Sequence, residues 1–179
     1  SYHENDKIFK IVDSKKLEKK RVTKQYATLK KKKKKVGEIK QVIVGSNTID
    51  ASELRTTIKK EDFSAIEHWL NDQKWFSHNA QIPHIKLFWL HVFNKKRPSM
   101  VPNYIIPSEY EMLEIISKNT GIAVVWDCNA KSALAENKIQ LLWNSKQMPS
   151  TNVFVLSGKN DNLSTVFENI QLELKRVLA

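Results

Sequence analysis

The sequence Gly-Ile-Ala-Val-Val-Trp-Asp-Cys-Asn at residues 121–129 decides the fold class. Its five apolar residues, 122–126, lie between a glycine and a group of residues that favour the start of a helix. A short, uninterrupted apolar run of this kind is typical of a strand that is covered on both faces. We therefore expect a buried strand at 122–126, followed by a helix that Asp127 or Asn129 caps.

A strand and a helix are also predicted immediately before this run. Residues 104–106 form a short apolar stretch. Ser108 stands three positions before Glu111, which is the spacing of a capping box at a helix start. The helix that follows presents an apolar stripe and is expected to end near Gly121.

The same pattern continues to the carboxyl terminus. The helix after the central strand is expected to extend through Leu142, residues 152–156 predict a further strand, and a closing amphipathic helix starts at Asn160 or Asp161. Strands that alternate with helices favour a parallel sheet with right-handed crossovers. We therefore predict an α/β fold, a three-layer or two-layer sandwich with a largely parallel sheet in residues 103–179.

Shorter elements are expected in the preceding part of the chain. Residues 41–44 predict a strand, and amphipathic helices are expected from Asp50 and from residues 61–62. Residues 84–93 fit both a helical stripe and a buried strand, since periodicity alone does not separate the two for a short apolar run. Pro83 suits the first turn of a helix and favours that interpretation.

The net charge is concentrated at the amino terminus. The chain has 179 residues and a formal net charge of +11. Residues 1–40 carry 15 basic and 5 acidic side chains, a net of +10, whereas residues 41–179 carry 15 and 14, a net of +1. We therefore divide the chain into a basic amino-terminal segment, 1–40, which can extend as a helix or a tail, and a single α/β domain, 41–179.

The basic segment predicts a polyanionic partner. Adjacent ammonium groups repel one another unless solvent or a polyanion compensates them, and a phosphate backbone binds lysine with release of counterions. Lysine is a point charge and suits phosphate contacts better than base recognition. The function expected first is a non-catalytic nucleic-acid-binding module, RNA or DNA, within a larger protein or complex. The predicted phosphate contacts are Lys15, Lys16, Lys19, Lys20, Arg21, Lys24, Lys30, Lys31, Lys32, Lys33, Lys34, Lys35, Lys95, Lys96 and Arg97.

Other functions are compatible with the same charge pattern. A short basic cluster also serves as a nuclear import signal, so the alternative is a protein-interaction domain of a nuclear complex, with a protein partner or a second copy of the chain. A third possibility is a nucleic-acid-processing enzyme centred on Asp127, and a solvated tail is the simplest of all. The expected location is nuclear, or cytoplasmic if RNA is the partner. Apolar runs such as 87–90 are too short to cross a bilayer, so no membrane partner is expected.

Aromatic residues next to cationic ones give a further candidate surface. Trp75 and Phe76 follow Lys74, and an exposed cluster of this kind can stack on single-stranded bases. Trp69, however, lies on the apolar stripe of the preceding helix, which favours a place in the core for these rings.

Motifs for catalysis or metal binding are missing from the sequence. The single cysteine, Cys128, excludes a zinc site made of cysteines, and it stands where a buried, inert thiol is common. The five histidines have no regular metal spacing; His84 and His91, seven residues apart, would be separated by two helical turns. Asp127 is expected to cap a helix. We therefore expect no enzyme activity, no cofactor and no metal.

Overall fold

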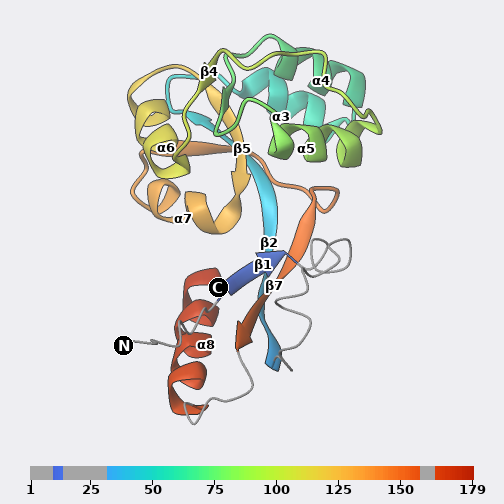
Figure 1. Cartoon of the computed structure of the whole chain (residues 1–179). Coiled ribbons are helices and arrows are strands. Elements are labelled where there is room, and N and C mark those ends of the chain that lie inside the picture. Colours follow the sequence, from blue (N-terminus) through green and yellow to red (C-terminus); the bar gives the residue numbers. More distant parts are fainter. Residues whose placement is uncertain (1–9, 14–31, 158–163) are drawn as a thin grey trace. The chain divides into compact units, whose positions relative to one another are not determined.

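The computed structural model describes residues 10–13, 32–157 and 164–179 (Figure 1). Contacts within the chain divide it into two compact units. Residues Lys40–Pro149 form the central unit, and Ser1–Ile39 together with Ser150–Ala179 form the terminal unit. The predicted division at residue 40 into a tail and one domain stays a prediction.

The sheet of the central unit is built around one long strand. Strand β2 (Lys32–Ser46) enters this unit at Lys40 and lies between β5 (Ile122–Trp126) and β6 (Ile139–Trp143). Both neighbours are antiparallel to β2. A small parallel pair, β3 (Phe76–Ser77) with β4 (Tyr104–Ile105), adjoins β5 through a parallel bridge.

Helices cover both faces of this sheet, and Figure 1 shows α6 and α7 on one side of β5 and α3, α4 and α5 on the other. The alternation of strand side chains explains the two layers. Ile43 and Val124 face the first core, whereas Val42 and Val125 face the second. The helices are α3 (Ser52–Lys59), α4 (Phe63–Asn71), α5 (Pro83–Phe93), α6 (Glu109–Lys118) and α7 (Asp127–Ala135).

The expected α/β class is confirmed, but the largely parallel sheet is wrong. Strands β5 and β6 run in the same direction with α7 between them, as the pattern 122–143 suggests. They are not neighbours, because β2 from the earlier part of the chain inserts between them and pairs antiparallel with each. Strand order is a long-range property, and local periodicity within residues 103–179 carries no information about it.

The helix expected to continue through Leu142 is shorter than predicted. Helix α7 ends at Ala135, and Leu142 lies in β6. The backbone N–H of Asn137 donates to Leu134 at 3.1 Å, and that of Lys138 donates to Ala133 at 2.9 Å. This is a Schellman end with Asn137 in the left-handed region at φ 53°. Asparagine tolerates this conformation, so it was the stop signal that the sequence offered.

Other local predictions are confirmed. Residues 83–93 form a helix with Pro83 in its first turn. Asp62 caps α4 by accepting from Ala65 N at 3.0 Å, and Ser108 caps α6 by accepting from Glu111 N at 3.3 Å. Capping signals are local, which is why the sequence identified them.

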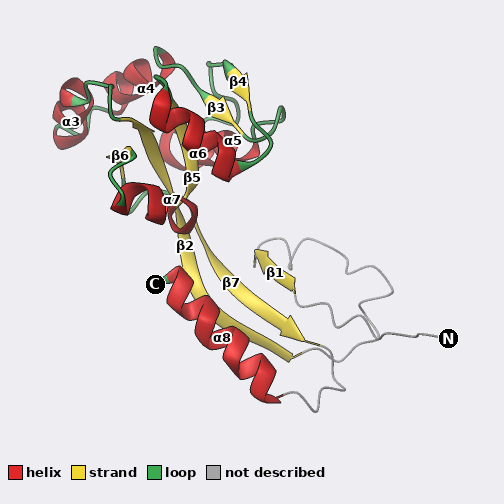
Figure 2. Ribbon diagram, turned by 90° about the vertical axis from the view of Figure 1, so that its left-hand side faces the viewer, coloured by secondary structure: helices red, strands yellow, loops and turns green. Residues whose placement is uncertain are grey.

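The described residues of the terminal unit form strands and one helix. Strand β1 (Lys10–Asp13) pairs antiparallel with β7 (Ser150–Ser157), β7 adjoins β2, and α8 (Ser164–Leu178) lies along β7 and β2 (Figure 2). Val36 and Val155 form its core with Leu178 from α8. Of the two alternatives for the amino-terminal segment, a helix or a tail, the structure shows neither at residues 10–13 and 32–35, which are strand, and residues 14–31 lie outside the described part. No helix among the described residues is long and apolar enough to span a bilayer.

Candidate functional site

A tight turn in the central unit brings two histidines together. Asn79 holds the turn: its carbonyl accepts from Ser77 Oγ at 2.8 Å and its side chain accepts from Gln81 N at 2.7 Å. Ile82 then adopts the left-handed region at φ 47°, which is strained for a β-branched residue. Because the chain reverses here, His78 before the turn and His84 after it face each other, with ring centroids 4.3 Å apart.

A carboxylate from another helix completes the cluster. Glu109 is the first residue of α6, and its Oε1 lies 3.3 Å from Nδ1 of His84 and 3.9 Å from Nδ1 of His78. The other oxygen, Oε2, accepts from the side-chain amide of Asn129 in α7. We call His78, His84 and Glu109 the His–Glu cluster. The His–Glu cluster connects the start of α5 with the start of α6. These two helices cover opposite faces of the sheet.

The His–Glu cluster is sheltered but open to solvent. The side chains of His78, His84 and Glu109 are 24%, 20% and 17% exposed. Burial and the neighbouring His84 lower the pKa of His78, against the opposing charge of Glu109. Burial raises the pKa of Glu109, but the His84 imidazole, the Asn129 amide and His78 together lower it more. The pKa of Glu109 therefore lies below its usual value. The favoured forms are a neutral His78 and an ionised Glu109.

The surroundings of His84 are polar and incompletely paired. Gln41 is fully buried, and its Nε2 donates to the backbone carbonyl of His84 at 3.2 Å. The buried Oε1 of Gln41 makes no hydrogen bond with described residues, whereas Nδ1 of His84 has Oε1 of Glu109 as its neighbour at 3.3 Å. The edge of Trp126 packs on the His84 ring at 5.6 Å. Buried polar atoms without partners are uncommon in folded proteins and point to an additional group that binds there.

Asp127 acts as a structural carboxylate. Its Oδ1 accepts from the backbone N–H of Cys128 at 2.8 Å and of Lys40 at 3.2 Å. It therefore ties the start of α7 to β2, but the expected capping role is wrong, because Asp127 is the first residue of α7 and the N-cap is Trp126, without a side-chain cap hydrogen bond. Burial and the Asp127 charge raise the pKa of Cys128, so its thiol is poorly activated.

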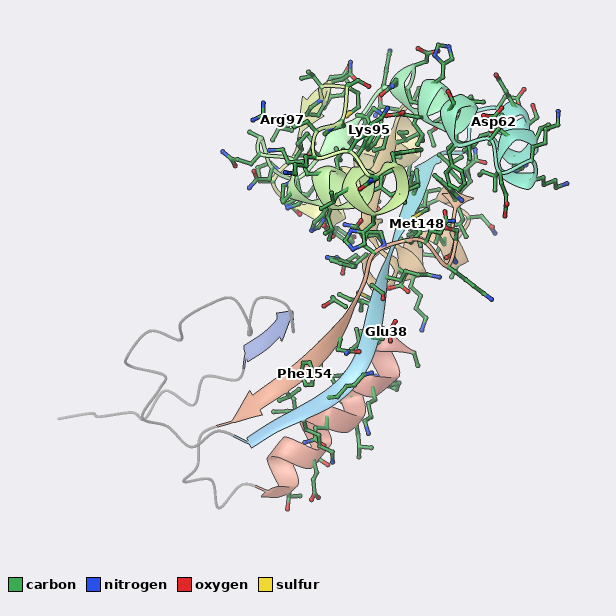
Figure 3. All side chains as sticks on the ribbon, turned by 90° about the vertical axis from the view of Figure 1, so that its right-hand side faces the viewer. Glu38, Asp62, Lys95, Arg97, Met148 and Phe154 are labelled. Atoms are coloured by element: carbon green, nitrogen blue, oxygen red, sulfur yellow. The ribbon has the colours of Figure 1, made fainter. Side chains whose placement is uncertain are left out.

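The predicted phosphate contacts are dispersed. Lys15 to Lys31 lie outside the described residues, Lys32 to Lys35 belong to β2, and Lys34 and Lys35 are exposed. Lys95, Lys96 and Arg97 follow α5 and are exposed (Figure 3). Nζ of Lys95 lies 2.5 Å from Oε2 of Glu67, so a carboxylate already compensates its charge. A phosphate-binding role for these side chains stays a prediction.

The aromatic surface is part of the core. Trp75 is 0% exposed and Phe76 is 3% exposed. The Trp75 indole N–H donates to Leu70 O at 2.7 Å. These rings are therefore inaccessible to bases, as the core interpretation predicted.

The described fold defines a class: it is similar to the regulatory domains of LysR-family transcriptional regulators. No family model matches the sequence, and the search of curated proteins found no match.

Three solved domains illustrate this likeness. The OxyR2 regulatory domain from Vibrio vulnificus has a TM-score of 0.53 and 11% identity, over 83% of this chain and 66% of that chain. The effector domain of the transcriptional regulator AmpR of Pseudomonas aeruginosa gives 0.53 and 14%, over 82% and 65%. The regulatory domain of HypT from Salmonella typhimurium, with bromide bound, gives 0.55 and 11%, over 97% and 72%. The chain spans about two thirds of the first two domains, and the likeness establishes the fold alone.

This likeness overturns the function expected from charge. The predicted nucleic-acid-binding module is wrong, because the fold is shared with regulatory and effector domains. The RNA partner has no support, and the relation to DNA is indirect, through the transcriptional regulators to which such domains belong. The enzyme centred on Asp127 is wrong on the same grounds. The three solved domains are named regulatory or effector domains, and the absence of catalysis in this chain stays a prediction.

The predicted location is also wrong. The three matched domains come from bacteria, which have no nucleus, so the nuclear complex and the import signal are not supported. The RNA partner on which the cytoplasmic alternative depended has no support, and a cytoplasmic location by itself stays a prediction. A protein partner or a homo-oligomer stays a prediction.

Sequence reasoning missed the His–Glu cluster. It looked for histidines at helical spacing, whereas His78 and His84 are joined across a turn. Asn79 and Pro83 marked that turn in the sequence, but nothing local associated it with Glu109, 25 residues after His84. Glu109 also suits the first turn of a helix for electrostatic reasons alone, which concealed its second role.

Proposed function

We propose that this chain is the ligand-sensing regulatory domain of a transcriptional regulator, and that the His–Glu cluster is part of its ligand site. The observation that carries the site is a sheltered cluster of two imidazoles and a carboxylate beside a buried glutamine whose Oε1 has no hydrogen-bond partner among the described residues. The fold likeness supports a regulatory role, since the similar domains are named regulatory or effector domains. In this account the ligand changes the state of a protein and is not turned over.

The residues suit a small polar ligand. Glu109 offers a carboxylate acceptor, and neutral His78 offers both a donor and an acceptor nitrogen. Trp126 gives an apolar wall next to His84. Convergent polar groups beside an aromatic wall are typical of small-molecule sites. DNA contacts belong, in this proposal, to another part of the regulator.

Thermal stability of the whole chain tests the proposal. Purified protein, with a chelator present throughout, is heated with a panel of amino acids, organic acids and inorganic anions at 5 mM, about 100 times a dissociation constant of 50 µM. A specific ligand at such an excess stabilises the folded chain by about 2.7 kcal/mol. The stabilisation should disappear in Glu109→Gln and persist in Glu111→Gln, whose carboxylate lies exposed in the same first turn.

Two results would count against this site. A compound that stabilises wild type and Glu109→Gln equally binds elsewhere. If no compound of the panel stabilises the chain, and the chain also binds no metal ion in the titration described below, the ligand-sensing proposal is refuted.

A further inference from the structure

We propose that His78, His84 and Glu109 bind a divalent transition-metal ion, and that Zn²⁺ is the ion they fit best. This inference deepens the proposed function, because it names a metal ion as the ligand of the same site. Within the described ranges, this is the group of histidine, cysteine and acidic side chains whose ligand atoms come close enough to share a metal: one atom from each lies within 4.8 Å of the others.

The distances are close to those of a metal site. Zinc binds imidazole nitrogen and carboxylate oxygen at about 2.0–2.2 Å, so two ligands of a tetrahedral ion lie roughly 3.3–3.6 Å apart. Oε1 of Glu109 is 3.3 Å from Nδ1 of His84 and 3.9 Å from Nδ1 of His78. All three ligand atoms lie within 4.8 Å of one another, so they must move closer together to reach tetrahedral spacing around an ion.

The chemistry of the three ligands selects the class of metal. Two imidazoles and one carboxylate suit zinc and its neighbours Co²⁺ and Ni²⁺, whereas Ca²⁺ and Mg²⁺ require mostly oxygen ligands. Metals bind neutral histidine and ionised carboxylate.

Neighbouring residues hold the ligands in place. The Asn129 amide engages Oε2 of Glu109 and leaves Oε1 directed at the imidazoles. Gln41 holds the His84 backbone from within the sheet, and Trp126 limits rotation of the His84 ring. Hydrogen bonds of this kind to ligating groups typically affect metal affinity about 10–100-fold. Asn129 is therefore a positioning residue.

Three protein ligands leave a fourth position available. Structural zinc sites are closed by four protein ligands, whereas sites with three keep a position for water or an exchangeable molecule. The partial exposure of all three side chains gives access to that position. Cys128 does not belong to the group of side chains whose ligand atoms lie within 4.8 Å of one another, so it is not a fourth ligand here. An exchangeable ion suits a sensor better than a permanent structural centre.

Metal binding would connect two layers of the central unit. His84 belongs to α5 and Glu109 to α6, and these helices pack on opposite faces of the sheet. An ion held by both links the layers at one end of the unit. The expected consequence is a metal-dependent gain in stability of this unit.

Direct titration of the whole chain, without a histidine tag, tests the inference. After dialysis against a chelator, Zn²⁺ is titrated in competition with a chromophoric chelator. One equivalent should bind. Affinity should fall at least 100-fold in His84→Ala and in Glu109→Gln, and about 10–100-fold in Asn129→Ala. His68→Ala and Glu111→Gln, both exposed, are the matched controls and should bind like wild type.

Structure and binding must be separated in the variants. Circular dichroism in chelator reports whether each variant is folded, and Glu109→Gln preserves shape and the contact to Asn129. Bound Co²⁺ gives a second readout, since imidazole and carboxylate ligands produce visible absorption bands that Glu109→Gln should shift or abolish.

The outcomes distinguish this inference from the proposed function. If wild type binds no Zn²⁺, or binds it as tightly as folded Glu109→Gln and His84→Ala, the metal site is refuted. If an organic ligand still binds in chelator and is lost in Glu109→Gln, the ligand-sensing proposal survives that refutation. If His84→Ala and Glu109→Gln lose zinc binding while the control variants keep it, the result supports both the metal site and the ligand-sensing proposal.

Discussion

Gly121 is where the backbone before β5 approaches the core most closely. A Cβ added there would lie 2.3 Å from Cε2 and 2.7 Å from Cδ2 of Phe76, and 3.2 Å from the backbone oxygen of Lys74. Two carbon atoms in contact lie about 3.5–4.0 Å apart. Because the new Cβ would lie only 2.3 Å from Cε2 of Phe76, the ring must move by more than about 1 Å. Phe76 is 3% exposed and stacks on Tyr104 at 4.8 Å, which leaves little room for that movement.

The expected result for Gly121→Ala is a loss of stability. Overpacking of a filled core costs about 1–3 kcal/mol. For a chain of this size each kcal/mol lowers Tm by roughly 2–4 °C. The backbone oxygen of Lys74 adds to the cost, because it accepts a hydrogen bond from Ile122 N at 2.8 Å that a shift of the backbone would weaken.

Urea unfolding followed by tryptophan fluorescence measures this effect, since Trp75 is fully buried next to the substitution. Gly37→Ala is the comparison: its new Cβ would lie 3.1 Å from Cδ1 and 3.2 Å from Cβ of Leu178, so the clash is smaller and the loss of stability should be smaller than for Gly121→Ala. The reasoning is refuted if Gly121→Ala unfolds within 0.5 kcal/mol of wild type, which is below the range of about 1–3 kcal/mol for overpacking.

Three further substitutions and treatments test other parts of the account. Ser108→Ala removes the cap of α6 and should cost about 1 kcal/mol in urea unfolding; an unchanged midpoint would mean that the contact to Glu111 N contributes nothing. Glu61→Gly should stabilise the chain by roughly 0.5–1 kcal/mol, because Glu61 is held at φ 53° in the left-handed region. Asn137→Gly should stabilise it less, because asparagine tolerates this region better. Equal gains in the two variants would contradict the argument that Glu61 is strained. Cys128 should react with iodoacetamide more slowly than free cysteine at pH 8, because burial and the Asp127 charge raise the pKa of its thiol. The rate should increase only at a pH above the ordinary thiol range. A reaction at pH 8 as fast as that of free cysteine would contradict the described burial of this side chain.

Local features of the fold were accessible from the sequence. The caps at Asp62 and Ser108 and the proline start of α5 depend on a few adjacent residues, and all three are as expected. The buried strand at 122–126 was identified because both of its faces are covered, which leaves a continuous apolar run. These features need no knowledge of distant parts of the chain.

Long-range features were not accessible. Nothing near residues 122–143 indicates that β2 inserts between β5 and β6, and this insertion makes the sheet antiparallel. The His–Glu cluster depends on the same kind of information, since Glu109 reaches the turn from a helix on the other face of the sheet. Charge misled the functional prediction, because a run of lysines gives a strong compositional signal and says nothing about the fold that follows it.

The most direct test of the ligand site observes the imidazole nitrogens themselves. In long-range ¹H–¹⁵N spectra of the whole chain, the five histidines give separate ring signals that site-directed variants assign. On addition of one equivalent of Zn²⁺, the signals of His78 and His84 should shift to metal-bound values, and those of His3, His68 and His91 should stay unchanged. Shifts confined to the other histidines, or no shift at all, would contradict the assignment of this cluster as the metal-binding site of the domain.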